Sequence, residues 1–176
     1  MDTLSRRGVL ALSGGLGALA AGSGPSRAQQ LATEAPHDPF VFAVQRSEAE
    51  WRAMLTDHEY EILREGDMEW PESSDLWDDY RPGEFHCRGC NLHVYSSEHR
   101  AEIDQGYVFF HHARPRTVLT DIDHTNVYTG RADDHRTMIE VHCRRCGSHF
   151  GHILRVGAEI VHCINGTSLV FLPNHA

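Results

Sequence analysis

The sequence predicts a mainly β domain (β+α), in which helices cover one side of antiparallel strands. Two helix start signals stand early in the folded part of the chain, between residues 47 and 66. From Glu84 onward, short apolar runs alternate with turn residues. Such runs are typical of antiparallel strands, and two Cys-x-x-Cys pairs lie among them. A chain of 176 residues is long enough for one domain with a hydrophobic core.

The first 28 residues resemble an export signal and are set apart from the fold. Arg6 and Arg7 form a twin arginine, an apolar stretch follows over 8–21, and Ser26 and Ala28 are spaced as a signal peptidase site. About 20 apolar residues are needed to span a bilayer, so this stretch is too short for an anchor. We expect a twin-arginine signal over 1–28, a flexible tether over 29–46 and a domain over 47–174. The mature protein would be periplasmic or secreted, with no membrane association once the signal is removed.

The charge balance bears on the kind of partner. The formal net charge is −9, and all 16 basic residues are arginines. No basic run exists beyond the first residues, which argues against nucleic acid and against anionic membranes as partners.

Two short helices are expected to open the domain, each with its own start signal. Ser47 and Glu50 form a capping box, followed by an apolar stripe that begins at Trp51. A second capping box at Thr56-Asp57-His58-Glu59 leads towards Gly66, the expected C-terminal stop.

The remaining elements are expected to be strands, because apolar and β-branched residues alternate with polar ones in short runs. The predicted strands are Phe85–Cys87, Leu92–Ser96, Gly106–Phe110, Thr117–Leu119, Asn126–Tyr128, 137–142, Phe150–Leu154, Glu159–Asn165 and Leu169–Leu172.

Four cysteines are spaced as metal ligands. Cys87 with Cys90, and Cys143 with Cys146, each place two thiols on one tight turn, and zinc is held tetrahedrally by four thiolates. The 52 residues between the pairs exceed the usual zinc-ribbon spacing, so the pairs should lie on hairpins from different parts of the sheet. The sequence therefore predicts one structural Zn²⁺ ion. Gly89 and Gly147 should supply positive φ at the turns.

Two other uses of these cysteines are weaker. An exported protein could hold two disulfides, or use one pair as a redox dithiol. A disulfide within Cys-x-x-Cys closes only a small strained loop, and two of them would join nothing distant.

The fifth cysteine, Cys163, is the candidate for chemistry. On a strand it shares a face with Val161 and Asn165, and His149 and His152 stand upstream as imidazoles that could bracket a reacting group. A lone cysteine is more often a buried, inert thiol, so the residues alone leave both interpretations open.

Several motifs together give the chain, from Glu50 to Pro173, a resemblance to the methionine-R-sulfoxide reductases of the MsrB (SelR) type. They are Trp51-Arg52-x-x-Leu55-Thr56, Tyr60-x-x-Leu63-Arg64-Glu65, Tyr95-Ser96-Ser97-Glu98, Arg136-Thr137-x-x-Glu140-Val141-x-Cys143-x-x-Cys146, His149-x-Gly151-His152 and Cys163-Ile164-Asn165-x-x-Ser168-Leu169.

The resemblance implies a folded-over pair of antiparallel sheets (a β-tent), a zinc ion distant from the site, and Cys163 as nucleophile. The Cys163 thiolate would attack the sulfoxide sulfur and become a sulfenic acid. His149 and His152 match histidines that position the substrate oxygen, and Asn165 matches an asparagine of the active-site strand. The implied partners are methionine sulfoxide, free or in oxidised proteins, and a thioredoxin-like or other thiol reductant.

The chain departs from the family pattern at several positions of the site. Tyr107 replaces the tryptophan that cups the substrate methyl group, with Phe110 beside it, and Val161 replaces an arginine. With four cysteines assigned to zinc, none is left as a resolving thiol. Two alternatives stay open: a reductase for another sulfoxide, or a non-catalytic zinc-centred β-fold ligand-binding module with Tyr107, Phe109 and Phe110 as an aromatic cup.

Other histidines could form a second metal site. His111 and His112, with His124 and His162, are the candidates, although solvated or hydrogen-bonded rings are the commoner outcome because no ligand spacing is diagnostic.

Overall fold

The computed structural model describes residues 40–123 and 138–174. Two helices come first, α2 (Glu48–Met54) and α3 (Asp57–Glu65). The strands that follow are β1 (Gly83–Cys87), β2 (His93–Ser96), β3 (Val108–Phe110), β4 (Val118–Asp123), β5 (Met138–Cys143), β6 (His149–Val156), β7 (Glu159–Ile164) and β8 (Leu169–Pro173). Single-turn 3₁₀ helices lie at Ser97–His99 (η1) and Gly166–Ser168 (η2).

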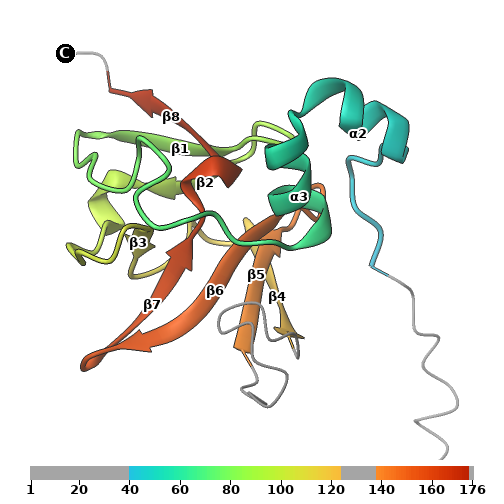
Figure 1. The fold of residues 1–176 in the computed structure, drawn as a ribbon. Coiled ribbons are helices and arrows are strands. Elements are labelled where there is room, and N and C mark those ends of the chain that lie inside the picture. Colours follow the sequence, from blue (N-terminus) through green and yellow to red (C-terminus); the bar gives the residue numbers. More distant parts are fainter. Residues whose placement is uncertain (1–39, 124–137, 175–176) are drawn as a thin grey trace, which may run out of the picture. The chain divides into compact units, whose positions relative to one another are not determined.

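The strands form two antiparallel sheets, which Figure 1 shows side by side. The smaller sheet has the order β2-β1-β8, and the larger has the order β3-β7-β6-β5-β4. The chain passes from the larger sheet to the smaller through η2, between β7 and β8. The predicted mainly β fold with two antiparallel sheets is confirmed.

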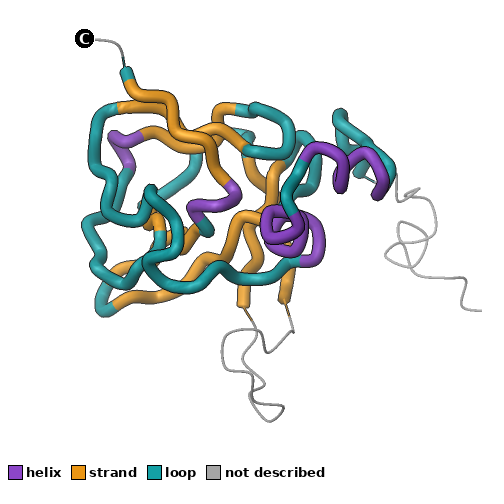
Figure 2. The backbone as a smooth tube through the Cα atoms, turned by 45° about the horizontal axis from the view of Figure 1, so that its top comes forward, coloured by secondary structure: helices purple, strands orange, loops and turns teal. Residues whose placement is uncertain are grey.

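Both helices begin as their sequence signals predict. Ser47 and Thr56 cap their helices, and in each capping box the glutamate three residues on accepts a hydrogen bond from the backbone amide of the cap residue. Gly66 ends α3 in the left-handed region with φ 78°. Ile62 and Leu63 are buried where α3 packs against β6 and η2, an arrangement that is visible in Figures 1 and 2.

Two apolar clusters lie on opposite faces of the larger sheet. Alternation along β7 sends Ile164 into the main core, which lies between the sheets and the helices, and sends Val161 and Cys163 to the other face. The main core includes Trp51, Ile62, Leu63, Phe85, Val94, Tyr95, Phe110, Val141, Phe150, Ile164 and Leu169.

Residues 41–46, assigned to the tether from sequence, lie against the domain. Val44 packs on the main core and its amide donates to the carbonyl of Arg145. The ring of Phe42 lies edge-on to that of His142. Sequence periodicity gave no sign of this packing, because the segment forms no helix or strand.

Two local expectations differ from the structure, and a third is not tested by it. Gly106, with φ 76°, and Tyr107 lie before β3 and not in it, because pairing with β7 begins at Val108. β4 extends to Asp123 because it pairs with β5 along its whole length. The predicted strand Asn126–Tyr128 lies outside the described residues.

Gly89 does not have the positive φ predicted for it. Asn91, with φ 59°, takes the left-handed position of that turn, whereas Gly147, with φ 71°, does so in the second turn. Gly89 is needed for space instead, since a Cβ there would stand 2.5 Å from the Ser148 hydroxyl. In the described part of the chain, no helix has the length and apolar character to cross a membrane.

Candidate active site and metal centre

The four paired cysteines converge where the two sheets meet. β1 of the smaller sheet ends at Cys87, and β5 of the larger sheet ends at Cys143. The Sγ atoms of Cys87 and Cys146 are 3.7 Å apart, and those of Cys90 and Cys143 are 3.6 Å apart. Four thiolates bound tetrahedrally at about 2.3 Å from an ion would be about 3.8 Å apart, so the sulfurs stand where a metal requires them.

The surroundings of the sulfurs also fit a bound cation. The amide of Arg145 donates to Cys143 Sγ over 3.4 Å, and the Ser148 hydroxyl lies 3.2 Å from Cys146 Sγ. Hydrogen bonds with neighbouring thiols, Cys143 first, raise the pKa of Cys87. Four thiolates at these distances would repel one another unless a cation lay between them.

Trp51 covers this cluster from the helical side. It is 4% exposed, and its ring lies 3.4 Å from where a Cβ at Gly89 would stand. The guanidinium groups of Arg46 and Arg64 lie over the same ring, at 4.7 and 4.5 Å from its centroid. All five cysteines lie in the described part of the chain, and none is joined in a disulfide there.

Cys163 lies in the middle strand of a three-strand group. On β7 it is the register partner of Phe109 on β3 and of His152 on β6. Register partners project on one face of an antiparallel sheet, so these three side chains share a surface. Cys163 is 2% exposed and packs with Phe109 and Val161. The position of the family arginine is thus filled by an apolar side chain inside this small cluster.

His149 reaches the same face of the larger sheet and lines a cleft. Its Nδ1 donates to Glu140 Oε1 over 2.7 Å, and its Nε2 is buried without a hydrogen-bond partner in the described residues. The hydrogen bond from His149 lowers the pKa of Glu140, so that carboxylate is ionised. Glu140, His149 and Asp123 line one wall of a cleft of about 260 Å³, with the end of α3 opposite.

His152 lies beside His149, with the ring centroids 5.3 Å apart. Its Nε2 donates to Asp123 Oδ2 over 2.8 Å. Burial lowers the pKa of His152, with Asp123 acting in the opposite direction, so the ring is neutral near pH 7. Each of the two histidines therefore has a carboxylate partner, which the sequence alone did not predict.

Asn165 and Glu69 form a buried pair after β7. Asn165 Oδ1 accepts from the amide of Glu69 over 3.2 Å, while its Nδ2 is buried without a partner in the described residues. The Glu69 carboxylate accepts from the amides of Gly166 and Thr167 over 2.7 and 2.8 Å. Glu69 is 2% exposed and stands in an irregular segment between Met68 and Trp70, where no sequence signal marks it.

Tyr107 and Phe110, both predicted to contact substrate, lie in different places. Tyr107 packs against the cluster that holds Cys163, and its pKa is raised by burial first and then by the nearby Cys163. Phe110 faces the main core, where its ring stacks on Tyr95 at 4.2 Å between centroids. The structure therefore does not bring Phe110 to Cys163; strand alternation places Phe109 there instead.

His111 and His112 do not gather with other metal ligands in the described residues. His111 is exposed and lies 3.7 Å from Glu159, while the His112 ring lies against His99. His162 is half-buried, with its Nδ1 3.0 Å from the hydroxyl of Tyr95. His124 lies outside the described residues. The four paired cysteines form one of two ligand clusters that the described residues contain, and the other is Glu84, His86 and His93.

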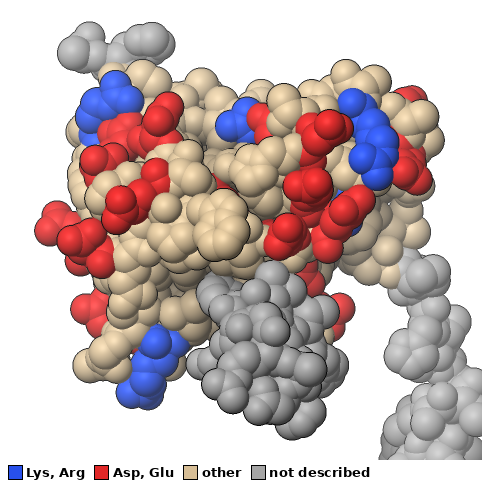
Figure 3. Space-filling view, in the orientation of Figure 1, with Lys and Arg blue, Asp and Glu red and all other residues tan. Residues whose placement is uncertain are grey.

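Carboxylates are spread over the face of the molecule seen in Figure 3, and arginines appear on it in a few separate places. The excess of acidic residues that gives the formal net charge of −9 is visible on this face, and no continuous basic patch is seen on it.

Comparison with known proteins gives a consistent result. The family model described as the SelR domain matches residues 55–173. The peptide methionine sulfoxide reductase MsrB of Chromohalobacter salexigens is 34% identical over 134 residues, which are 74% of this chain and 96% of the relative. The MsrB of Methanosarcina barkeri is 33% identical over 132 residues, or 73% of this chain and 88% of the relative. Peptide methionine sulfoxide reductase B3 of Arabidopsis thaliana is 29% identical over 136 residues, with 74% and 72% covered.

Proposed function

The chain belongs to the SelR family of methionine sulfoxide reductases, and from this premise we propose that it reduces methionine-R-sulfoxide through the thiol of Cys163. The observation that carries the proposal is the grouping of Cys163, His149 and His152 on one face of the larger sheet, with Tyr107 beside the thiol. The chain spans most of the length of these relatives.

The first half of the reaction reduces the sulfoxide and oxidises Cys163. The sulfur of Cys163 attacks the sulfoxide sulfur and forms an S–S bond, while the S–O bond of the substrate breaks and the oxygen takes up two protons and leaves as water. Water then attacks the Cys163 sulfur, which breaks the S–S bond and releases methionine. The net result is methionine and a sulfenic acid on Cys163, so the substrate is reduced by two electrons and the cysteine is oxidised by two.

His149 is the group best suited to protonate that oxygen. Glu140 is ionised and accepts from Nδ1, which fixes the orientation of the ring. The buried Nε2 has no partner in the described residues and is therefore the nitrogen left to exchange a proton with a substrate oxygen. His152, neutral and held by Asp123, would position the oxygen or a water beside it.

Tyr107 and Phe109 supply the apolar surface for the methyl group of the substrate. Their rings meet edge to face, with centroids 6.5 Å apart, and both pack with Cys163. Of the two residues predicted from sequence to bind substrate, Tyr107 is kept, and Phe109 takes the place of Phe110.

The second half of the reaction needs thiols from outside the chain. The other four cysteines face one another at the junction of the sheets, so none is offered to the sulfenic acid. Two equivalents of an external thiol would return Cys163 to the thiol, forming water and the disulfide of the reductant. A thioredoxin-like protein or another thiol reductant fits this role.

We assign zinc to the four-cysteine site. Four thiolates in a closed tetrahedron, with sulfurs 3.6–3.7 Å apart where measured, are the donor set that zinc prefers, and they leave no open position for substrate. Its role would be structural, because the site joins β1 of one sheet to β5 of the other.

We also propose that the protein is exported through the twin-arginine route to the periplasm or beyond. The support is the order of twin arginine, short apolar stretch and small residues over 1–28. Replacing Arg6 and Arg7 together by Lys should leave the precursor in the cytosol. Equal amounts of the double variant and the wild type in the periplasmic fraction would contradict the assignment.

The test of the catalytic proposal is turnover by Cys163→Ser. The variant should lose reduction of methionine-R-sulfoxide while it keeps its metal content and melting temperature. In the wild type, substrate without reductant should produce a dimedone adduct at Cys163 and no intramolecular disulfide. Phe110→Leu, in the core, should lower stability but keep KM, whereas Phe109→Leu should raise KM.

The alternative functions appear as distinct outcomes of the same test. Turnover of a different sulfoxide with none for methionine-R-sulfoxide would identify a reductase of other specificity. A Cys163 that reacts with iodoacetamide only after denaturation, in protein that reduces no sulfoxide, would identify a binding module.

A further inference from the structure

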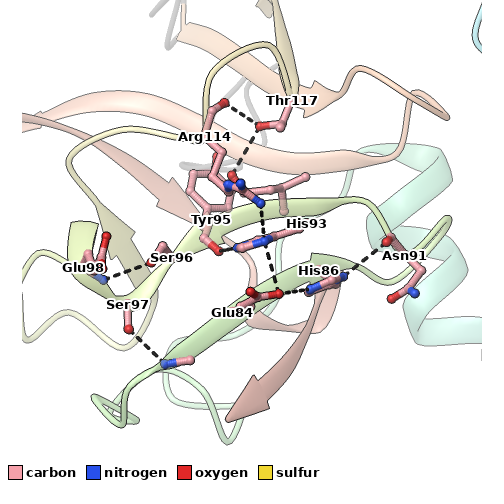
Figure 4. Close-up of polar contacts among 12 residues, drawn as sticks. Glu84, His86, Asn91, His93, Tyr95, Ser96, Ser97, Glu98, Arg114 and Thr117 are labelled. Carbon is pink, nitrogen blue, oxygen red and sulfur yellow. Dashed lines mark hydrogen bonds and ion pairs between the residues drawn. The ribbon is translucent and has the colours of Figure 1, made fainter. Parts of the chain in front are cut away.

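The second ligand cluster lies on the smaller sheet, away from the thiols. Glu84 and His86 are two residues apart on β1 and so project on the same face, and His93 on β2 is the register partner of His86. The two rings stack with centroids 4.9 Å apart. One nitrogen of each ring and a carboxylate oxygen of Glu84 all lie within 4.8 Å of one another, and Figure 4 shows the three side chains converging.

Backbone carbonyls determine which nitrogen of each ring carries the proton. His86 Nδ1 lies 3.2 Å from the carbonyl of Asn91, and His93 Nε2 lies 2.9 Å from the carbonyl of Tyr95. A carbonyl oxygen can only accept, so each of these nitrogens is an N–H donor. In a neutral ring, the lone pair is then on the other nitrogen, His86 Nε2 or His93 Nδ1.

These two nitrogens point at the same oxygen. His86 Nε2 is 2.9 Å and His93 Nδ1 is 3.2 Å from Glu84 Oε2. Three acceptor atoms at these distances repel one another unless a proton or another cation lies between them.

A cation does reach the cluster in the structure. The guanidinium of Arg114, Nη1, makes a close hydrogen bond with His93 Nδ1, as Figure 4 shows. Its side chain is exposed, while its backbone amide is held by the carbonyl of Val94. Arg114 is therefore a cation on a long, rotatable stem, able to leave the cluster without unfolding the loop.

We propose that Glu84, His86 and His93 form a second metal site, for a divalent ion of the Zn²⁺ or Ni²⁺ class. Two imidazoles and one carboxylate, each imidazole donating its other N–H to a backbone carbonyl, are a usual donor set and outer shell for such ions. Bonds of about 2.0–2.1 Å bring ligand atoms to roughly 3–4 Å, so only small side-chain rotations are needed. The side chains of His86 and His93 are 13% and 17% exposed, which leaves solvent a path to the site.

A bound ion would connect two strands, and Arg114 would compete with it. The ion would link β1 to β2, the strands on either side of the turn that carries Cys90, with Cys87 at the end of β1. Arg114 would compete with it, because both cations seek the lone pair of His93 Nδ1. This site is independent of the reaction at Cys163, which lies on the other sheet.

The experiment uses untagged full-length protein with its four-cysteine site loaded with zinc, titrated with Ni²⁺ by calorimetry. We expect one site that His93→Ala and Glu84→Gln each weaken at least tenfold, and that Arg114→Gln strengthens severalfold. Saturating Ni²⁺ should also raise the melting temperature of the wild type and not that of His93→Ala. Glu84→Gln keeps the shape of an exposed side chain and should fold, so it tests the site even if His93→Ala does not fold.

His112→Ala is the matched control, since that exposed ring also lies against a second histidine, at 3.9 Å between centroids. It should leave the Ni²⁺ affinity unchanged. The proposal is overturned if His93→Ala and Glu84→Gln bind Ni²⁺ as tightly as the wild type, or if Arg114→Gln does not increase the affinity. Zinc measured at one equivalent before and after titration shows that the cysteine site was not exchanged.

Discussion

At the scale of single residues, His162 makes the stability of the domain depend on pH. Burial, with a smaller effect of His112, lowers its pKa to about 4. Between this value and the ordinary value of about 6.5, the unfolded chain binds a proton at His162 and the folded chain does not. The free energy of unfolding therefore increases as the pH rises through this window, and this gain is lost as the pH falls towards 4.

The corresponding prediction is a reduced pH dependence in His162→Gln. The wild type should lose on the order of 1–2 kcal/mol between pH 7 and pH 4 from this residue, after allowance for solvent around a half-buried ring. Urea unfolding at several pH values gives the slope. His58→Gln, at an exposed helical position, is the control and should keep the wild-type slope. Identical slopes in all three proteins would contradict the prediction.

The sequence located some of these residues and not others for physical reasons. The cysteines of the metal centre were predictable because two pairs of thiols, each pair separated by two residues on a tight turn, are typical zinc ligands. Glu140 and Asp123 were not identified as partners of the histidines, since cross-strand contacts depend on register, which the sequence does not fix. Glu69 was missed because its partners are backbone amides, and any segment of the chain can offer those.

At the scale of elements, Gly151 is needed for the central strand pair to form. It stands in β6 with φ 147°, and a Cβ there would lie 2.1 Å from the carbonyl oxygen of Cys163. The atom that the Cβ would meet belongs to the backbone of β7, which cannot move aside without breaking the hydrogen bonds between β6 and β7. His152 and Cys163 owe their shared face to this close approach of β6 and β7.

We expect Gly151→Ala to destabilise the protein by at least about 3 kcal/mol, because a backbone clash adds to an unfavourable φ. Gly157→Ala is the control, since Gly157 has φ 59° with nothing within 4 Å of the added Cβ. That variant should cost about 1 kcal/mol, the conformational term alone. Chemical denaturation measures both, and similar losses in the two variants would argue against the clash.

Helices were predicted more closely than strands. Capping boxes and a terminal glycine are local signals, and α3 ends at the glycine they indicate. Strand limits depend on partners far away in the chain, which is why β3 begins later and β4 ends later than apolar runs suggest. The assignment of Phe110 to substrate binding was affected by the same dependence on distant partners. The register of β3 with β7 decides which aromatic residue of β3 faces the Cys163 thiol.

At the scale of the whole domain, the cysteine cluster lies where the two sheets meet. Cys87 ends β1 of the smaller sheet and Cys143 ends β5 of the larger, so a metal bound by all four cysteines would join the sheets, and loss of a ligand on either side would remove that link. Cys143→Ser should prevent accumulation of folded protein, and chelation of the metal should lower the melting temperature strongly. One zinc per chain is the expected content. Metal-free protein with an unchanged near-UV circular dichroism spectrum would contradict a structural role.

The burial of Trp51 against the cysteine turns gives the protein a built-in optical signal. Trp70, by contrast, is 79% exposed, and its emission already reports water. When the metal leaves and the turns separate, the indole of Trp51 loses its contacts with the cysteine turns and with two guanidinium groups and becomes exposed to solvent. Its fluorescence should then shift to longer wavelength, while that of Trp70 stays constant. In a Trp77→Phe variant, which removes the third indole of the chain, emission spectra would therefore follow metal loss in real time, in dilute solution and without a label.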